Sequence, residues 1–351
     1  MTDFNKYKGK TVLVTGHTGF KGSWLCRILV NLGAKVVGYS LEPPTEPSLF
    51  KLCNIEKDII SIIGDIRDLE KLKKVFEEYS PDIVIHLAAQ PIVRESYQSP
   101  VYTYETNVMG TVNVCECVRL SKSVKSFVNV TTDKVYENKE WCWGYRENER
   151  LNGFDPYSNS KSCSELVTQC YINSFFKDTD IAVSTARAGN VIGGGDFAQD
   201  RIVPDCVRAA SKENAIVIRN PYSIRPFQHV LEPLYVYRMI AIIQYDNKKY
   251  ASSYNVGPND EDCIRTGELV QIFCKEWGQN ISWSSKNDGG PHEANLLKLD
   301  CSKLKDTFGW KPRWNVREAI AKTVEFYKVW NENQDLSSVL DSQIKDFFNI
   351  N

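Results

Sequence analysis

The sequence lacks the features of a membrane-spanning, exported or nucleic-acid-binding protein. No run approaches the roughly 18 consecutive apolar residues of a membrane helix. The first ten residues are polar and lack the apolar centre of a signal peptide. The 43 Lys and Arg residues balance 44 Asp and Glu residues, for a net charge of -1, so nothing favours nucleic acid or a membrane surface as partner. We therefore expect a cytoplasmic protein.

The sequence also lacks a Cys-x-x-Cys pair, although it contains 11 cysteines. Cys115 and Cys117 are two residues apart, a spacing that on a helix points them to different faces. One interpretation is metal binding. The other is small apolar side chains in a reducing compartment, which the scattered positions favour. No metal is expected.

Apolar runs alternate with helical patterns through the first half of the chain. With 351 residues, 42% hydrophobic and 25% charged, the chain fits one large globular unit or two intimate ones. Alternating strands and helices predict parallel strands joined by right-handed crossovers, covered by helices on both faces. The expected strands are Lys10–Gly16, Lys35–Tyr39, Ile59–Gly64, Ile83–Ala88, Ser126–Val130 and Ile181–Ala186, and the expected helices are a first one ending at Gly33, Leu69–Tyr79, Thr103–Leu120 and Ser158–Phe176.

After about Gly189 the pattern changes, because glycine and proline turns interrupt it. The expected fold class is therefore α/β: a doubly wound parallel sheet (Rossmann) with a smaller C-terminal substrate-binding lobe. We expect residues 1–188, with a returning segment near 230–257, to form the dinucleotide-binding domain. Residues 189–229 and 258–351 are expected to form the lobe, and ligands should gather at the carboxyl ends of the strands.

A glycine loop follows the first expected strand. Gly16, Gly19 and Gly22 give Gly-x-x-Gly-x-x-Gly before the first helix. Glycine permits a tight turn and lets the backbone approach a pyrophosphate, while the helix N-terminus offers free N–H groups. In the first strand-turn-helix unit, this indicates dinucleotide binding more than a turn for helix packing.

The second expected strand does not end in the acidic residue that usually binds the adenosine ribose. Ser40 or a neighbour occupies that position, and Glu42 lies past the strand. The choice between NAD and NADP is therefore open at this point. Asp65, after the third strand, is expected to bind the adenine amino group, and a helix cap before Leu69 is an equal alternative.

Tyr157 and Lys161 form Tyr-x-x-x-Lys at the start of an expected helix. This spacing puts phenol and ammonium on one face, and we expect the ammonium to lower the pKa of the tyrosine. A phenolate can take a proton from a sugar hydroxyl while hydride leaves the same carbon. The alternative is an exposed helix pair.

The residues Thr132, Asp133 and Lys134 end the fifth expected strand, on the other side of the same crevice. Thr132 can hydrogen-bond a substrate hydroxyl, and the next two residues supply an acid and a base. Alcohol oxidation needs no such pair, whereas proton abstraction beside a carbonyl with loss of water does. A solvated loop pair is the alternative.

Together these motifs resemble the extended short-chain dehydrogenase/reductase family of sugar-nucleotide enzymes. Residues 16–25, 42–50 and 131–161 are most similar to the branch of 4,6-dehydratases that acts on CDP-glucose, and the resemblance covers nearly the whole chain. It implies conversion of CDP-glucose to CDP-4-dehydro-6-deoxyglucose and water with NAD, NADP not being excluded. It further implies a homodimer built on the helices that carry Asn107 and Tyr157, and a role in deoxysugar and O-antigen synthesis.

The resemblance also implies which residues form the site. Asn107 would orient the tyrosine and lysine from a neighbouring helix, and Arg219 or Arg225 would grip the diphosphate, with a surface ion pair as the alternative. His229 is expected to be structural and strand-like. The expected catalytic residues are Thr132, Asp133, Lys134, Tyr157 and Lys161; the cofactor-binding residues are Gly16, Thr18, Gly19, Phe20, Lys21, Gly22, Ser40, Asp65, Ile66, Leu87, Ala88, Ala89, Asn107, Tyr157 and Lys161; the substrate-binding residues are Gln90, Asn190, Arg201, Arg219, Arg225 and His292, the last beside Glu293.

Other functions remain compatible with the motifs. A sugar-nucleotide 4-epimerase, a dehydratase acting on another nucleotide, and a catalytically silent module that senses a nucleotide are the alternatives. The intact Thr132, Tyr157 and Lys161 argue against the silent module. No motif reads cytosine.

Overall fold

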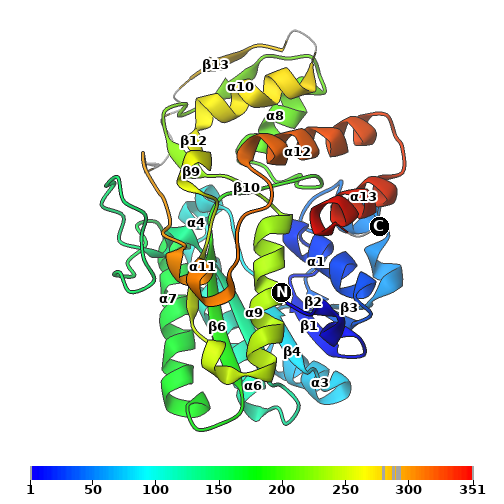
Figure 1. The fold of residues 1–351 in the computed structure, drawn as a ribbon, viewed down its shortest axis with the longest axis vertical. Coiled ribbons are helices and arrows are strands. Elements are labelled where there is room, and N and C mark those ends of the chain that lie inside the picture. The colour runs from blue at the N-terminus through cyan, green and yellow to red at the C-terminus, as the bar shows by residue number, and fades with distance from the viewer. Residues whose placement is uncertain (1, 279–280, 287–288, 290–293, 350–351) are drawn as a thin grey trace.

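The computed structural model describes residues 2–278, 281–286, 289 and 294–349. A seven-stranded sheet forms its centre. The strands are β1 (Thr11–Thr15), β2 (Lys35–Ser40), β3 (Ile60–Ile63), β4 (Ile83–His86), β5 (Ser126–Thr132), β6 (Ala182–Ala188) and β11 (Ser253–Val256). Their order is β11-β6-β5-β4-β1-β2-β3, and every neighbouring pair is parallel. The predicted doubly wound sheet is confirmed (Figure 1).

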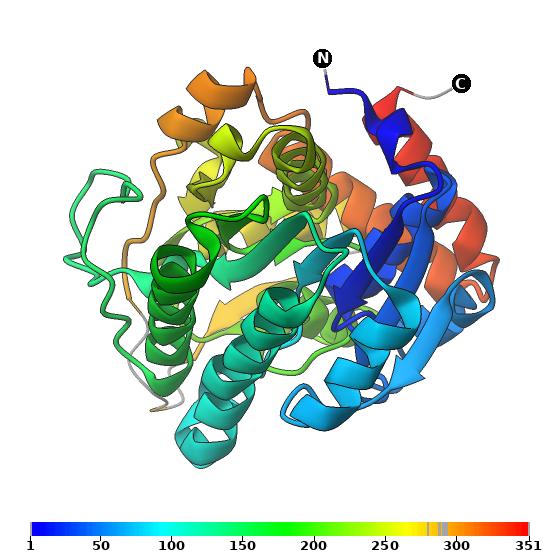
Figure 2. The same cartoon turned by 90° about the horizontal axis from the view of Figure 1, so that it is seen from below.

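Helices cover both faces of the sheet, as the apolar strands predict (Figure 2). In β1, Val12 and Val14 join one apolar core while Leu13 joins the other, because successive side chains of a strand point to opposite faces. The first core includes α1 (Phe20–Asn31) and α9 (Leu231–Asp246), and the second includes α3 (Leu69–Tyr79) and α6 (Gly110–Leu120), beside α7 (Pro156–Tyr171).

Two of the predicted helices contain π-helical turns. The helical stretch that ends in α6 begins with α5 (Pro100–Tyr104) and η3 (Glu105–Met109), and η5 (Ile172–Phe176) prolongs α7. Such turns often occur near functional sites, and η3 contains Asn107.

Most of the chain after Gly189 lies outside the central sheet. Only α9 and β11 rejoin the sheet half, where β11 pairs with β6, and the other elements come before and after these two. Three two-stranded sheets pair β10 with β7, β12 with β9 and β13 with β8. These and the remaining elements are β7 (Val191–Ile192), α8 (Ile202–Ala210), β8 (Ile216–Ile218), β9 (Ile224–Pro226), β10 (Gln228–His229), η7 (Asp260–Asp262), β12 (Cys263–Arg265), α10 (Thr266–Trp277), β13 (Trp283–Ser285), α11 (Ser302–Phe308), α12 (Val316–Asn331) and α13 (Leu336–Phe348), with η1 (Phe4–Tyr7), α2 (Leu49–Leu52), η2 (Ile55–Asp58), α4 (Val93–Gln98), η4 (Asp133–Val135) and η6 (Lys248–Tyr250) in the sheet half.

The C-terminal helix α13 lies beside α1 (Figure 1). The guanidinium of Arg27 donates hydrogen bonds to both carboxylate oxygens of Asp341, at 2.8 and 2.6 Å. The end of the chain therefore packs on the dinucleotide half, and the division into two domains stays a prediction.

His229 is structural and lies in a strand, as predicted. Its ring is fully buried, with ring centroids 6.0 Å from Trp24 and 4.9 Å from Trp314. Burial lowers the pKa of His229 to about 3, so the ring is neutral at physiological pH and serves packing.

A buried ion pair connects α7 to strand β6 of the sheet. Arg187 of β6 donates to Glu165 of α7 at 2.9 Å, and both side chains are almost completely buried. The same carboxylate accepts from Thr131 and Thr185. Four groups on α7, β5 and β6 are thus fixed relative to one another beneath the carboxyl ends of the strands.

Replacing one partner of this pair should destabilise the fold strongly. In Glu165→Gln the guanidinium of Arg187 stays buried without its counter-charge, which costs about 3–5 kcal/mol. Urea denaturation measures the loss. The matched control Glu116→Gln removes a partly exposed pair with Arg119, which contributes about 0–1 kcal/mol. Equal losses in the two variants would show that the buried pair has no special role.

Candidate active site

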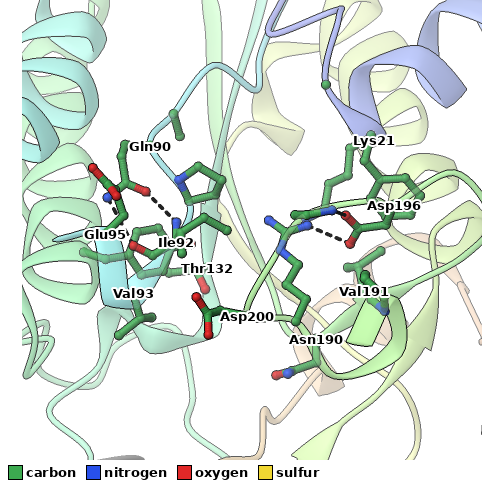
Figure 3. Close-up of a pocket in the computed structure, with 18 of the residues that line it drawn as sticks. Lys21, Gln90, Ile92, Val93, Glu95, Thr132, Asn190, Val191, Asp196 and Asp200 are labelled. Carbon is green, nitrogen blue, oxygen red and sulfur yellow. Dashed lines mark hydrogen bonds and ion pairs between the residues drawn. The ribbon is translucent and has the colours of Figure 1, made fainter. Parts of the chain in front are cut away.

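A cavity of about 1890 Å³ opens at the carboxyl ends of the strands. Small-molecule sites usually measure about 300–1,000 Å³, so this one has room for two ligands side by side. Every predicted site residue within the described ranges lines it except Asn107. Figure 3 shows Lys21, Asn190 and Asp196 on one side of the view, with Gln90, Glu95 and Thr132 on the other.

The glycine loop lies close against the backbone that follows β4. A Cβ at Gly16 would lie 2.8 Å from the Ala88 nitrogen, and one at Gly22 would lie 2.1 Å from the Gly16 carbonyl oxygen. Gly16 also has φ +77°, which other residues rarely adopt. No side chain caps the start of α1 after Gly19. The loop and helix end therefore present backbone N–H groups, as an anion site requires.

The end of β2 carries a hydroxyl network in place of an acidic residue. Ser40 Oγ lies 2.8 Å from Thr18 Oγ1 and 3.1 Å from His17 Nδ1. The other ring nitrogen of His17 lies 2.8 Å from Ser61 Oγ on β3. Burial lowers the pKa of His17 to about 4, so a neutral ring fixes Ser40 in the cavity wall, and Glu42 lines the wall beyond it.

Asp65 does not cap a helix, so that alternative is wrong. The cap of α3 is Asp68, whose carboxylate accepts from the Lys71 amide. Asp65 lines the cavity and forms an ion pair with Arg67 at 2.7 Å, and hydrogen bonding from Arg67 lowers the pKa of Asp65. Its carboxylate is thus charged at the cavity wall.

The start of α7 sets the position of Tyr157. Asp155 accepts from the Ser158 amide at 2.9 Å, and Pro156 occupies the first turn, a combination that favours a helix start here. Lys161 follows one turn later, is buried and donates to the Val130 carbonyl at 3.3 Å. The two side chains line the cavity, so the alternative of an exposed helix pair is wrong.

The prediction that Lys161 lowers the pKa of Tyr157 is wrong for this structure. Burial raises the pKa of Tyr157 to about 12, although Thr132 and Arg201 act in the opposite direction. Burial lowers the pKa of Lys161 to about 8. The spacing along the helix predicted that the two side chains lie on one face. It did not predict the burial that determines the direction of both pKa shifts.

Asp133 is a buried acid, so the alternative of a solvated loop pair is wrong for it. Its Oδ1 accepts from Thr132 Oγ1 at 3.0 Å, and its Oδ2 is buried without a hydrogen-bond partner among the described residues. Burial raises the pKa of Asp133, opposed by Lys134, Thr132 and Arg225. This environment shifts the carboxyl at the cavity wall toward its protonated form. Lys134 is half-buried beside it.

A cationic side chain from the glycine loop faces the same region. Burial, together with Arg201 and Lys161, lowers the pKa of Lys21 to about 8, while Asp133 and Asp196 oppose the change. Crowded cations of this kind favour binding of an anion.

Asn107 does not line the cavity or contact the side chains of Tyr157 and Lys161, in contrast to its predicted role. Its amide donates to the Gln90 carbonyl at 3.0 Å and to Ser160 Oγ at 2.9 Å, and its oxygen accepts from the Gln90 amide. Ser160 in turn donates to the Tyr157 carbonyl. Asn107 therefore ties α7 to the loop after β4 indirectly.

Gln90 lines the cavity, yet its side-chain amide is engaged within the protein. Its nitrogen donates to Thr103 and to the Ile92 carbonyl, and its oxygen accepts from the Ile92 amide. The side chain thus fixes the loop that leads into α4.

The predicted substrate arginines reach the cavity from the C-terminal half. Arg201 pairs with Asp196 at 2.8 Å and Arg219 with Asp200 at 2.8 Å, both inside the cavity. Arg225 is buried and donates to the carbonyls of Ile224 and Ala294, so its guanidinium does not lie on the surface.

Asn190 also lines the cavity. His292 and Glu293, the other predicted contacts of this region, lie outside the described residues.

The sequence reasoning missed three charged residues of the site. Arg94 and Asp200 line the cavity and lie 3.6 Å apart, and Glu165 lies beneath it. Glu165 follows Lys161 at the i+4 position, a spacing that could have suggested one helix face. Arg94 and Asp200 are distant in sequence and carry no comparable signal.

Neither a metal centre nor a membrane helix is present in the part of the chain that the structure describes. There, no group of three or more His, Cys, Asp or Glu side chains could hold a metal ion. The 11 cysteines are free, and both Cys115 and Cys117 are buried. No described helix is long and apolar enough to cross a bilayer.

The family model described as GDP-mannose 4,6 dehydratase matches residues 13–323. The chain belongs to this dehydratase family. Within it, the CDP-glucose 4,6-dehydratase of Salmonella typhimurium is 48% identical over 99% of the chain and 98% of that protein. A dTDP-glucose 4,6-dehydratase of Xanthomonas campestris is 28% identical over 90% of the chain and 93% of that protein.

Solved structures of similar enzymes share the fold. A dTDP-glucose 4,6-dehydratase of Bacillus anthracis in complex with NAD superposes with a TM-score of 0.77 at 21% identity, covering 93% of the chain and 99% of that structure. A UDP-glucose 4-epimerase of Thermotoga maritima gives 0.77 at 20% identity, covering 91% and 98%. Dehydratases and epimerases thus share this scaffold, and the site residues must separate them.

The buried carboxyl of Asp133 should make the stability of this family member fall as pH rises. Its pKa is raised in the folded chain, so the folded state holds the proton more tightly than the unfolded state, and stability is lost as the carboxyl ionises above its ordinary value of 3.8. Asp133→Asn removes the ionisation. We expect the variant to be more stable than the parent at neutral pH, with the difference shrinking as pH falls, measured by urea denaturation.

A matched control uses an exposed carboxylate. Asp68→Asn keeps a good helix cap and removes no buried charge, so its stability should follow that of the parent at every pH. If Asp133→Asn were less stable than the parent at neutral pH, its carboxyl would be a stabilising anion and not a buried acid.

Proposed function

We propose that the chain is a CDP-D-glucose 4,6-dehydratase, converting CDP-glucose to CDP-4-dehydro-6-deoxy-D-glucose and water. The observation that carries the proposal is the buried carboxyl of Asp133, with a raised pKa and an unpartnered Oδ2 at the cavity wall. A 4-epimerase needs no acid for a leaving hydroxyl. The relative named CDP-glucose 4,6-dehydratase, 48% identical over nearly the full length, supports the choice of nucleotide.

The glycine loop fits a dinucleotide cofactor, and we propose NAD. A Cβ at Gly16 or Gly22 would clash with the protein's own backbone, so the tight loop requires glycine at both positions, and the uncapped start of α1 suits a pyrophosphate. At the end of β2, Ser40 and the carboxylate of Glu42 line the cavity. A second negative charge near Glu42 would be repelled, which disfavours the additional phosphate of NADP.

Tyr157 serves in this proposal as the base for the 4-hydroxyl, with Thr132 holding that hydroxyl. The chemistry that NAD+ supplies when bound is reversible hydride acceptance, from C4 first and back to C6 at the end. Because burial raises the pKa of Tyr157 to about 12, loss of its proton must be assisted by positive charge. Arg201 already lowers the pKa of Tyr157, and Lys161 lies one helical turn away.

Asp133 and Lys134 then serve the elimination. The 4-ketone acidifies the C5 proton. Lys134 either removes this proton or stabilises the enolate that its removal forms. Asp133 gives its proton to the departing 6-hydroxyl as water leaves. The proton that Lys134 removed would return to C5 as bound NADH supplied hydride to C6. The net change is loss of one water from the sugar, with no net change in the cofactor.

The substrate is held in this proposal by the C-terminal half. Asn190, Arg201 and Arg219 line the cavity with polar groups suited to a diphosphate, and Arg225 lies in its wall. We propose that residues 189–229 and 258–351 act as the substrate lobe above a dinucleotide half of residues 1–188 and 230–257. The cytoplasmic location and the role in O-antigen synthesis stay predictions.

Incubating the purified protein with CDP-glucose and NAD+ should yield a sugar nucleotide lighter by one water, with no accumulation of NADH. Mass spectrometry of the product and absorbance at the NADH band measure the two results. Tyr157→Phe should lower turnover by about 10²–10⁴-fold, the usual contribution of a general base. An unchanged mass with a new 4-epimer would replace the dehydratase by an epimerase.

The same assay in heavy water assigns the role of Lys134. If Lys134 removes the C5 proton, Lys134→Met should abolish exchange of that proton with solvent. Continued exchange would reject the base role and leave enolate stabilisation.

We also propose that the protein is a homodimer formed by the helices around α7. Large apolar side chains on these helices are exposed, so packing on the sheet does not fully account for them. They are Tyr97, Val101, Met109, Leu120, Leu166 and Phe175, between 42% and 70% exposed. Exposed apolar side chains of this kind favour self-association.

Placing a charge in this patch should dissociate the dimer. The double variant Val101→Glu/Leu166→Glu is expected to sediment as a monomer in analytical ultracentrifugation, because the two carboxylates would be buried against a second copy. Trp143→Glu, which changes an equally exposed side chain elsewhere, should leave the dimer intact. A monomeric parent protein would contradict the proposal.

A further inference from the structure

The carboxyl of Asp133 and the residue Gly189 are neighbours at the edge of the sheet. Asp133 follows β5 and Gly189 follows β6, and the last residues of these strands, Thr132 and Ala188, are paired in register. Both Asp133 and Gly189 are buried, and both line the cavity. The two strand ends therefore form one piece of the cavity wall.

This wall has no room for a side chain at position 189. A Cβ on Gly189 would lie 3.1 Å from Asp133 Oδ2, 2.6 Å from Pro226 Cγ and 3.3 Å from the Pro226 carbonyl oxygen. Carbon atoms pack best at about 3.5–4.0 Å, so the contact with Pro226 would be a clash. The backbone of Gly189 is not left-handed, so space, and not backbone conformation, requires glycine here.

The oxygen beside Gly189 is the one left to hold the proton of the carboxyl. Oδ1 of Asp133 accepts a hydrogen bond from Thr132 Oγ1 at 3.0 Å, as the carbonyl oxygen of a protonated carboxyl does. Oδ2 is buried and has no hydrogen-bond partner among the described residues. The O–H of the neutral acid therefore belongs on Oδ2, the atom next to Gly189.

Pro226 closes the same space from the other side. It is buried in β9, which pairs with β12, and its closed ring cannot turn away. Two residues later the Gln228 amide donates to the Asn190 carbonyl at 3.0 Å, which ties β10 to the chain just after Gly189. The carboxyl of Asp133, by contrast, is held by one hydrogen bond and can rotate. An added methyl group would therefore displace the carboxyl before it displaced the proline.

The buried position of the carboxyl works against charges that favour its ionisation. Burial raises the pKa of Asp133, while the hydrogen bond from Thr132 and nearby cations oppose this shift. The cations are Lys134, Arg225 and Lys21, and the other titratable groups within reach of its charge, whose pKa values it raises, are Tyr157, Tyr237 and Cys263. A carboxyl pushed out of this position would regain water and keep the cations, and both changes favour the carboxylate.

We propose that Gly189 is a positioning residue for the loss of water. Its missing side chain, with Pro226 closing the far side, gives the Asp133 carboxyl the buried position from which it protonates the departing 6-hydroxyl. This role rests on the proposed function, because it concerns the acid of that reaction. Gly189 has no side chain to offer the substrate, so it acts through Asp133.

A double-mutant cycle of stability tests the buried position without any substrate. In the parent, Asp133→Asn should gain stability as pH rises, since the folded chain resists ionisation of the carboxyl. In the Gly189→Ala background this gain should shrink, because the displaced carboxyl ionises more easily. Each unit by which its pKa falls should reduce the gain by about tenfold in the ratio of folded to unfolded protein. Urea denaturation of the four proteins at acidic and at neutral pH measures the change.

Gly257→Ala is the matched control for the added methyl group. Gly257 follows β11, the next strand of the sheet, and a Cβ there would lie 3.5 Å from Cys301 Sγ, an ordinary contact. In this background the gain from Asp133→Asn should equal the gain in the parent. If the gain were also unchanged in the Gly189→Ala background, the proposal would be overturned.

The two halves of the reaction separate a role in elimination from general damage to the site. With CDP-glucose and NAD+, Gly189→Ala should still transfer hydride from C4 to NAD+ and the 4-hydroxyl proton to Tyr157. It should lose water at least about tenfold more slowly than the parent, because a general acid contributes about 10²–10⁴-fold. NADH absorbance should then accumulate, and mass spectrometry should find a sugar nucleotide lighter by two hydrogens instead of by one water. Loss of water at the parental rate, or equal slowing of both steps, would contradict the role of Gly189.

Replacing Pro226 shows whether the clash is the cause. Pro226→Ala removes Cγ, the atom that lies nearest to the added Cβ. The double variant Gly189→Ala/Pro226→Ala should therefore regain most of the parental rate of water loss, and it provides a folded protein to compare if Gly189→Ala alone folds poorly. A double variant that loses water as slowly as Gly189→Ala would overturn the proposal.

Failure of the proposed function gives a different result. If the parent released no water from CDP-glucose or from UDP-, dTDP- and GDP-sugars, the dehydratase would be wrong and Gly189 would have no elimination to serve. The stability cycle would still show whether Gly189 keeps the carboxyl buried. If the parent dehydrated one of the other nucleotide sugars with the same dependence on Gly189, only the nucleotide would be wrong, and the role of Gly189 would stand.

Discussion

The buried ion pair between Glu165 and Arg187 is the constraint on which the geometry of the site depends. At 2.9 Å, with both side chains almost completely buried, the pair contributes less by its net energy than by the large cost of moving either charge alone. Arg187 also donates to the Tyr136 hydroxyl at 2.8 Å, just beyond Asp133 and Lys134. The helix that carries Tyr157 and the strand end next to Asp133 are therefore held in a fixed position relative to each other.

Burial around this frame shifts the pKa values of the proposed catalytic groups. It raises the pKa of Asp133 and Tyr157 and lowers that of Lys21 and Lys161. In each case the neutral form is favoured, because charge is costly away from water. A site arranged this way shifts its carboxyl toward the protonated form, and it gains most when a charged ligand brings compensating charge to its lysines and arginines.

The sequence predicts those features of the fold and the site that depend on the spacing of neighbouring residues. The consecutive apolar residues Val12, Leu13 and Val14 predict a strand buried on both faces, and the positions of Gly16 and Gly22 predict the loop, because both follow from backbone geometry within a few residues. The pKa of Tyr157 could not be predicted, since it depends on burial by distant segments. The contact of Arg94 with Asp200 likewise joins residues more than 100 positions apart, and no periodicity reports such a pair.

The fold alone cannot define the reaction, because the reaction depends on a few side chains that distant segments bring together. Dehydratases and epimerases share this scaffold at similar TM-scores, so the parallel sheet and the glycine loop are compatible with either activity. Under the proposed function the difference lies at the end of β5, where Asp133 supplies a buried carboxyl that an epimerase does not need. Burying Asp133 costs stability at neutral pH and adds nothing to the sheet. A costly group at the wall of a ligand cavity is best explained by the chemistry it performs there.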